Sequence, residues 1–580
     1  MPYYPTRKLT ILALDPSVRD GGRILRTQIE VPNESLSVGP RGYRVHVIDY
    51  DATTGAWRAP ARIPAGMNCD SAPPRDPFEE VSDEKLLADR SFHGFMTYGI
   101  VMKTLARFEF ALGRRIGWSF GGHQIQVAPH AFADANAFYA VDTQGLHFGY
   151  FPNADGTRRV YSCLSHEIVA HETTHALLDG LRERYMDPSS PQQAGFHEGF
   201  ADIVALLSIL SAESVVARVV DLGMPRRDGD TLARAAVTPE KLRRSGLFGL
   251  AEEMGTELAG IHGQALRRSI ALEPRGDYLT SGDYAEPHNA GEVLVAAVLN
   301  AYLEVWVNRL QAIGNQTTLD RKRAAEEGAE IADRLLTMCI RAIDYCPPTD
   351  LQFRDFASAI LTADWELNPR DEKYRIRASL LKSFRAYGIE PSSPGSKGRQ
   401  EGSWDQPPEG TPFRYDRTHF DSMKTDPQEL FLFLWENRAA FQLNEQAHTR
   451  VLSVRPSVRT GRDGFILRET VAEYHQQIKL FARELQAYGI TKPEGMPADT
   501  PVTLYGGNAV IFDEYGHVKY NIGNAIMDRK RDEVQKRQSR RLEDLWKAGA
   551  FERGASKARA FSRMHLRRGT AWYRSVRSPE

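Results

Sequence analysis

The chain has 580 residues, of which 42% are hydrophobic and 26% charged, and its formal net charge is −1. This length exceeds one hydrophobic core and predicts several domains, while the composition excludes a disordered or fibrous chain. The near-zero net charge excludes a molecule whose overall field draws it to nucleic acid or to membranes.

The first 78 residues are rich in Pro and Gly and alternate around Val45 and Val47, which predicts strands and turns. From 79 to about 112, apolar residues recur at three- and four-residue spacings, as in a helix that packs on a core. Short strands are expected again over 118–151. This part of the chain is therefore predicted to mix strands with one long helix.

Two apolar helices follow, at about 161–185 and from about 197 to 210, with a loop rich in Pro, Ser and Gln between them. Further helical patterns cover 213–221, 247–270, 290–312, 319–345 and 351–387. The sequence thus predicts an α+β protein whose strands come first and whose helices dominate the middle.

The segment 391–412 is the strongest candidate linker because it is rich in Pro, Gly and Ser. The region 413–500 has mixed patterns, and a hairpin is expected at 508–523. The tail from 529 to 577 is strongly basic. A solvated, charged helix pair is the more frequent structure of such a run, and nucleic-acid binding is the alternative.

Cysteine usage and targeting signals bear on the compartment. Four scattered cysteines form no CxxC pair, so neither a disulfide framework nor a cysteine zinc site is expected, and their scarcity is typical of a reducing compartment. The N-terminus meets Asp15, Arg19 and Asp20 early, unlike a signal peptide. No run of about 18 apolar residues predicts a membrane span. We expect a cytoplasmic protein with no membrane contact.

His171, Glu172 and His175 form an HExxH pattern within a predicted helix. Positions i and i+4 share one helix face, so both imidazoles can converge on one ion, and zinc accepts their nitrogens. Glu172 can reach a water at the metal without binding the metal. A helix whose histidines merely cap or pair with acids is the alternative, and the apolar flanks Ile168 and Val169 argue against it.

Glu198 and Asp202 stand four residues apart at the head of the next predicted helix, so they share a face. Glu198 can complete a His₂Glu zinc site with an open fourth position. Asp202 can accept the spare N–H of a ligating histidine. Acidic capping of a helix start is the alternative. The sequence predicts one zinc, held by His171, His175 and Glu198.

These motifs resemble those of the gluzincin metallopeptidases, and of the thermolysin-like family in particular. That family's third ligand lies in a Glu-x-x-x-Asp motif about twenty residues after HExxH, and here 22 residues separate His175 from Glu198. The metzincin pattern is excluded because Leu178 and Leu181 occupy its glycine and histidine positions. Over about 80–390, the resemblance implies a two-lobed α+β fold, with a strand-rich N-terminal lobe and a helical C-terminal lobe.

The resemblance also implies a substrate-binding strand. Its residues would be Asn136, Ala137, Phe138 and Tyr139, which are similar to the family's edge strand ahead of the metal helix. An exposed strand edge binds extended peptides through main-chain hydrogen bonds. Core packing is the alternative use of four such residues.

Further catalytic groups are implied in the same way. The stretch 283–291 resembles a family segment whose histidine stabilises the oxyanion and whose aspartate orients that histidine, which gives those roles to His288 and Asp283. A structural helix cap is the alternative for His288. Tyr185 matches the family's oxyanion tyrosine, although its spacing from Glu198 differs. Either Arg268 or Arg275 could match the substrate-binding arginine.

The implied activity is zinc-dependent hydrolysis of internal peptide bonds, with peptides or proteins as substrates. No double calcium site is expected, because apolar residues follow Asp202 where acidic ligands would stand. The alternative is a catalytically silent or latent protein of this fold that binds a protein or nucleic-acid partner. The expected divisions are a β-rich region at 1–78, lobes at 79–186 and 187–390, a linker at 391–412, and a mixed α/β C-terminal domain at 413–580.

Overall fold

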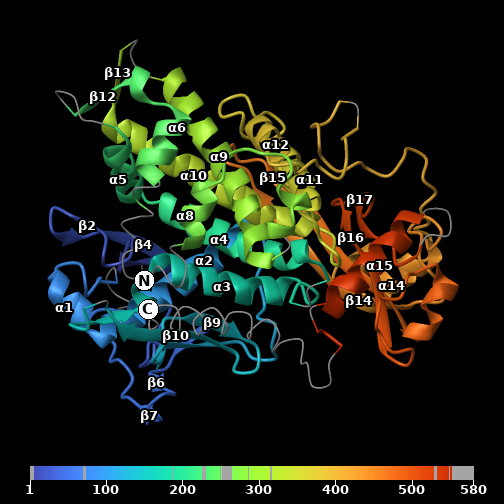
Figure 1. Cartoon of the computed structure of the whole chain (residues 1–580), viewed down its shortest axis with the longest axis horizontal. Helices are drawn as coiled ribbons and strands as arrows, with labels where there is room; N and C mark the ends of the chain where they lie inside the picture. Colours follow the sequence, from blue (N-terminus) through green and yellow to red (C-terminus); the bar gives the residue numbers. More distant parts are fainter. Residues whose placement is uncertain are drawn as a thin grey trace.

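The computed structural model contains both helices and strands, so the predicted α+β class is confirmed at that level (Figure 1). It describes residues 5–68, 74–153, 155–186, 189–224, 230–247, 250, 264–284, 286–313, 317–396, 398–527, 532–547 and 549–551. Most of the basic tail, and with it the predicted nucleic-acid contact, lies outside these residues. Among the described cysteines, Cys163, Cys339 and Cys346 are buried and free.

The N-terminal strands form two main groups. A five-stranded sheet has the order β11-β10-β8-β5, with β9 paired to β10. Its strands are β5 (Val45–Val47), β8 (Ile125–Phe132), β9 (Ala137–Ala140), β10 (Gly145–Pro152) and β11 (Arg159–Tyr161). The ribbon of β1 (Thr6–Leu12) and β4 (Arg26–Pro32) packs with the sheet around α2 (Arg90–Leu112). Short pairs complete the region: β2 (Arg19–Asp20), β3 (Arg23–Ile24), β6 (Tyr50–Asp51) and β7 (Ala56–Trp57), followed by α1 (Asp83–Ala88).

The middle of the chain is helical. Its long helices are α3 (His166–Leu181), α4 (Pro191–Leu210), α5 (Glu213–Gly223), α9 (Pro287–Ala312), α10 (Arg321–Ala342), α11 (Phe353–Leu367) and α12 (Ile376–Ala386). Smaller elements are β12 (Thr231–Ala233), α6 (Pro239–Lys241), α8 (Gln264–Ala271) and β13 (Thr318–Asp320). In Figure 1, α3 lies between β9 and β10 on one side and α4 and α9 on the other. The helices α3 and α4, which carry the predicted metal ligands, are thus at the centre of the fold.

Two helix boundaries differ from the sequence prediction. α4 begins at Pro191, inside the predicted loop, because the Ser190 hydroxyl caps the Gln193 N–H and Pro191 suits the first helical position. Glu198 therefore lies in the second turn of the helix, and the capping alternative does not apply. The predicted helix 351–387 is two helices, because Pro369 disfavours helical geometry at Asn368. Much of the predicted helix 247–270 lies outside the described residues.

Glycines bring α4 and α9 into backbone contact. A Cβ atom on Gly199 would lie 2.7 Å from the Gly291 carbonyl oxygen, and one on Gly195 would lie 2.8 Å from that of Pro287. Side chains at these positions would push the helices apart. The close approach sets the first turn of α9 against the turn of α4 that carries Glu198.

Gly199→Ala should therefore destabilise the protein by about 1–3 kcal/mol, since the contact is with backbone that cannot rotate away. Urea unfolding measures the loss. Gly121→Ala is the matched control, because a Cβ there meets open space, and its effect should stay within about 0.5 kcal/mol. Equal stability of the two variants would contradict the close packing of α4 on α9.

The C-terminal part is a four-stranded antiparallel sheet in the order β14-β15-β16-β17. The strands are β14 (His448–Thr460), β15 (Ile466–Phe481), β16 (Pro501–Phe512) and β17 (Val518–Asn524), and the last two confirm the predicted hairpin. Helices α13 (Phe420–Met423), α14 (Pro427–Glu436) and α15 (Asp532–Lys547) accompany the sheet. In Figure 1 α14, α15 and β17 lie at one end of the molecule, whereas β15 reaches back toward α11.

The predicted linker 391–412 joins the helical part to this sheet, but part of it is packed on the helices. The indole N–H of Trp404 donates to the Tyr345 carbonyl at 2.9 Å, and its backbone N–H donates to the Thr362 hydroxyl at 2.8 Å. β14 is docked as well, because the Val458 N–H donates to the Gly113 carbonyl at the end of α2, at 3.0 Å. The sheet is therefore fixed to the helical part by main-chain bonds as well as side chains.

α9 is a candidate for a membrane span by length and hydropathy alone. Within the described residues, it is the one unbroken helix that meets both criteria, and 89% of its apolar window is buried inside the protein. α4 and α5 meet the criteria only as a pair bent by 88°. The apolar character of α9 is accounted for by its place in the core.

Candidate functional site

Three predicted ligands converge between α3 and α4. The Nε2 atoms of His171 and His175 lie 2.8 Å apart. Glu198 Oε2 lies 3.7 Å from the first and 3.8 Å from the second. All three side chains are buried, and their ligand atoms fall within 4.8 Å of one another. The arrangement follows from one helical turn between the histidines and from the packing of α3 on α4.

The other ring nitrogens of the two histidines face hydrogen-bond partners. His171 Nδ1 lies 2.8 Å from Asp202 Oδ1, as the sequence predicted for Asp202. His175 Nδ1 lies 2.7 Å from Nδ1 of His197, and the two rings stack. Such partners fix the tautomer that directs each Nε2 toward a metal. Sequence reasoning missed His197, although its position next to Glu198 places it at the same helix contact.

The site attracts positive charge. Burial alone would lower the pKa of His171, but Asp202, Glu172 and Glu198 outweigh it and raise that pKa to about 9. Three carboxylates around one buried imidazole make the local potential negative. A divalent cation would satisfy this charge. The donor set of two imidazoles and one carboxylate is the one that catalytic zinc uses with an open fourth position.

Asp202→Asn should weaken zinc binding by about 10- to 100-fold, because an amide holds the His171 N–H less strongly than a carboxylate. Competition with a chromophoric chelator measures the affinity. Asp179→Asn is the control. This buried α3 carboxylate accepts a hydrogen bond from the Tyr139 hydroxyl at 2.8 Å, and Tyr139 is not one of the predicted metal ligands. If both variants bind zinc as the wild type does, Asp202 does not support the metal ligand.

Glu172 lies between the ligands and the strand β9. Its Oε2 accepts the backbone N–H of Tyr139 at 2.9 Å. The predicted strand residues therefore lie next to the predicted base. Asn136 precedes the strand, and its side-chain oxygen accepts the Ala137 N–H at 2.9 Å. The two rings of the strand have different surroundings: Phe138 stacks on Phe132, whereas Tyr139 is buried.

His288 joins the site from the first turn of α9. Its Nε2 lies 3.9 Å from Glu198 Oε2, and its Nδ1 lies 2.6 Å from Glu286 Oε1. Burial opposes ionisation of Glu286, yet the bonds to His288 and to backbone N–H groups lower its pKa to about 2. Glu286 thus holds the His288 ring through Nδ1, and the predicted role of Asp283 in orienting His288 stays a prediction. The Asp283 side chain lies outside the part that the structure describes.

Tyr185 packs in the core of the protein. Its hydroxyl donates to the Pro347 carbonyl at 2.8 Å, and its ring packs edge-on against Phe196 in the core. Burial raises the pKa of Tyr185 well above its ordinary value. An oxyanion role would require this bond to break, so the structure supplies no contact in favour of that prediction.

The two arginine candidates differ in their surroundings. Arg268 on α8 forms an ion pair with Glu292 of α9 at 2.7 Å. Arg275 pairs with Asp277 and lies over the Tyr278 ring. Because α8 packs on α9, Arg268 is tied to the helix that carries His288.

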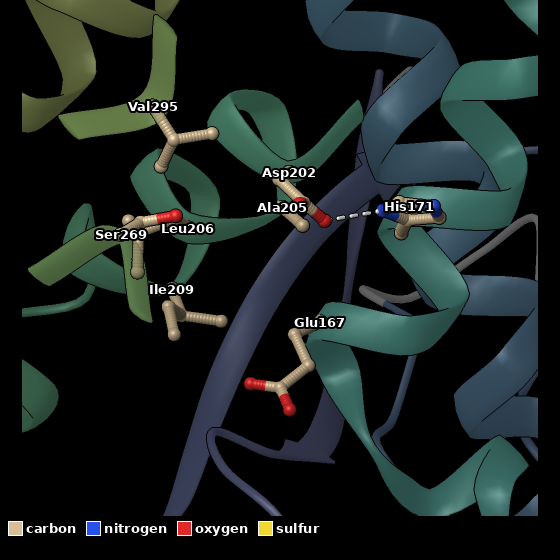
Figure 2. Close-up of a pocket in the computed structure, with 8 residues that line it drawn as sticks. All are labelled: Glu167, His171, Asp202, Ala205, Leu206, Ile209, Ser269 and Val295. Carbon is tan, nitrogen blue, oxygen red and sulfur yellow. Dashed lines mark ion pairs between the residues drawn. The ribbon is translucent and has the colours of Figure 1, made fainter. Parts of the chain in front are cut away.

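A cavity of about 30 Å³ adjoins His171 on the side of its bond to Asp202 (Figure 2). Its walls are Glu167, His171, Asp202, Ala205, Leu206, Ile209, Ser269 and Val295. Burial, then the nearby charges of Asp15 and Asp202, raise the pKa of Glu167 to about 8. Glu167 is therefore mostly protonated at neutral pH and adds little negative charge to the cavity beside His171.

Comparison with known proteins adds no relative to these observations. No protein-family model matches the chain, and no curated protein sequence matches it.

Proposed function

We propose that this chain is a zinc-dependent endopeptidase of the thermolysin-like gluzincin type. One observation carries the proposal: the ligand atoms of His171, His175 and Glu198 meet beside a Glu172 carboxylate that is fixed by the edge strand β9. A metal site, a general base and a peptide-binding edge are the three parts that peptide hydrolysis at zinc needs.

His171, His175 and Glu198 would hold the zinc, and their donor chemistry fits it. Both Nε2 atoms and one carboxylate oxygen are buried together, and Asp202 and His197 direct the imidazoles. When bound, zinc supplies a Lewis acid that polarises the substrate carbonyl and acidifies water.

Glu172 is the proposed general base. It removes a proton from the attacking water and then delivers that proton to the leaving nitrogen as the C–N bond breaks. The Tyr139 N–H holds one of its oxygens, so the carboxylate keeps a fixed direction. His288 is the proposed donor to the oxyanion through Nε2, with Glu286 fixing the ring through Nδ1.

The strand β9 is the proposed substrate-binding edge. Among the described residues it pairs only with β10, with Phe138 opposite His147. Backbone groups of an antiparallel strand alternate between its two edges. Because the Tyr139 N–H points away from β10, the carbonyl groups of Ala137 and Tyr139 face the same way. The N–H groups on this edge are held by Asn136 and Glu172, so a peptide would bind by donating its own N–H groups to these carbonyls. An extended peptide would add to this edge next to Glu172.

The two-lobed thermolysin-like arrangement and a cytoplasmic location belong to the same proposal. The order of the motifs along the chain supports the former, since the edge strand, HExxH, Glu-x-x-x-Asp and histidine motifs follow one another over 136–288. The sparse cysteines support the latter.

The test is hydrolysis of a mixed pool of internally quenched peptides by the purified full chain. We expect cleavage between internal residues, its loss with a zinc chelator, and its return on adding zinc. Mass spectrometry of the products separates internal cleavage from removal of terminal residues. Zinc-loaded protein that cleaves no peptide in the pool would overturn the proposal in favour of a silent protein of this fold.

A further inference from the structure

A second group of metal-binding side chains lies outside the site described above. His93 on α2, His130 on β8 and Cys163 in the turn before α3 are fully buried, and one donor atom of each lies within 4.8 Å of the others. His93 Nδ1 and His130 Nε2 lie 2.9 Å apart. The three residues come from segments far apart in the sequence, so the fold itself brings them together.

The remaining nitrogens of both imidazoles have partners of the kind that metal ligands have. His93 Nε2 lies 3.0 Å from the Leu87 carbonyl oxygen. His130 Nδ1 lies 3.0 Å from Asp49 Oδ1, and Asp49 is itself paired with Arg90. A backbone carbonyl and a carboxylate are the usual acceptors behind ligating histidines.

These partners determine what the two facing nitrogens can be. A carbonyl only accepts, so His93 carries its proton on Nε2 and presents a lone pair at Nδ1. An ionised Asp49 likewise accepts a hydrogen bond from the N–H at His130 Nδ1. His130 Nε2 then faces the His93 lone pair with either a second proton or a lone pair of its own. The space between them is thus the place for a proton or for a metal ion.

The sulfur favours the metal ion. A proton shared by two imidazoles requires no third group, whereas Cys163 adds a donor at the same point. The catalytic-site candidate has the same pattern: two histidine nitrogens at 2.8 Å, their other nitrogens held, and a third donor alongside. Both clusters therefore have two facing histidine nitrogens and a third donor, which is a carboxylate in the first cluster and a thiol in the second.

We propose that His93, His130 and Cys163 form a second metal site, which takes zinc in a structural role. Imidazole and thiolate together select zinc among the common divalent ions. Complete burial leaves no room for a peptide at the site. The metal would tie α2 and the sheet to the turn Ser162–Leu164, directly before α3. It would thereby fix the start of the helix that carries His171 and His175.

A small cavity lies near the cluster, but none of the three donor residues lines it. It has a volume of about 30 Å³, and its walls include Leu87, Tyr161 and Leu164. The Tyr161 ring lies against both imidazoles, with centroid separations of 4.9 and 5.3 Å.

The test measures metal content and cobalt spectra of the full chain, and it does not depend on peptidase activity. We expect two zinc equivalents in the wild type and one in Glu198→Ala. After exchange into cobalt, a thiolate-to-cobalt charge-transfer band should appear in the near ultraviolet. Because the first site has no sulfur ligand, the band reports on the second site alone. It should persist in Glu198→Ala.

Cys163→Ala should lose the band and one metal equivalent, while Cys339→Ala, another buried free cysteine, should keep both. If Cys163→Ala fails to fold, the wild type and Glu198→Ala still decide the question. One zinc in the wild type, with no charge-transfer band on cobalt, would overturn the proposal and leave a proton between the histidines.

Discussion

Glu172→Gln should abolish most peptide hydrolysis while the protein keeps its fold and its metal. The amide has the shape of the carboxylate and still accepts the Tyr139 N–H, but it cannot take a proton from water. Losing a general base typically lowers the rate by about 10²–10⁴-fold. Turnover of an internally quenched peptide and zinc content, measured on the same preparation, give the result.

Glu183→Gln is the matched control for this variant. Glu183 follows the end of α3, and its side chain is half exposed beside Arg450, so its turnover should equal that of the wild type. Undiminished hydrolysis by Glu172→Gln would remove Glu172 from the mechanism. Loss of zinc together with turnover would instead make it a support of the metal site.

Asp344→Asn should destabilise the protein by about 3–5 kcal/mol, the usual cost of breaking a buried ion pair by removing one partner. Asp344 is 1% exposed and accepts two bonds from Arg114, at 2.5 and 2.6 Å, as well as one from Arg459 of β14. The amide would leave two buried guanidinium groups short of negative charge. Urea unfolding gives the free-energy change.

The pH dependence of the same pair has a definite sign. Burial alone would raise the pKa of Asp344, but Arg114 and Arg459 outweigh it and lower the pKa below its ordinary value of 3.8. The stabilisation is therefore present above about pH 4 and is lost as pH falls through the folded-state pKa. The difference in stability between wild type and Asp344→Asn should shrink in that range.

Glu330→Gln is the control for Asp344→Asn. It removes the Glu330 carboxylate that pairs with Arg462. Like the Asp344 pair with Arg459, this pair joins the helical part to the C-terminal sheet, but it is partly exposed. Exposed pairs contribute about 0–1 kcal/mol. If both variants lost equally little stability, the buried network would not hold the C-terminal sheet in place.

Periodicity and motif spacing were sufficient to predict most helices and the convergence of His171, His175 and Glu198. His171 and His175 depend only on their own helix, and Glu198 needs only a second helix packed against the first. Helix ends were less predictable. The composition around Ser190 and Pro191 predicts a loop, whereas the structure shows that they cap and begin α4.

Partners that depend on tertiary packing could not be predicted. Glu286 bonds His288 only because α9 begins where it does, and no spacing rule separates Glu286 from Asp283. His93, His130 and Cys163 are isolated residues in the sequence, separated by 36 and 32 positions. Their convergence is a property of the sheet and of α2, which local patterns do not specify.

The most direct test of the proposed catalytic zinc site is anomalous diffraction at the zinc absorption edge from crystals of the full chain grown with zinc. We expect a peak about 2.0–2.2 Å from Nε2 of His171, Nε2 of His175 and a carboxylate oxygen of Glu198. Zinc elsewhere in the crystal, with no peak among these three residues, would contradict the assignment of this site and the peptidase mechanism that depends on it.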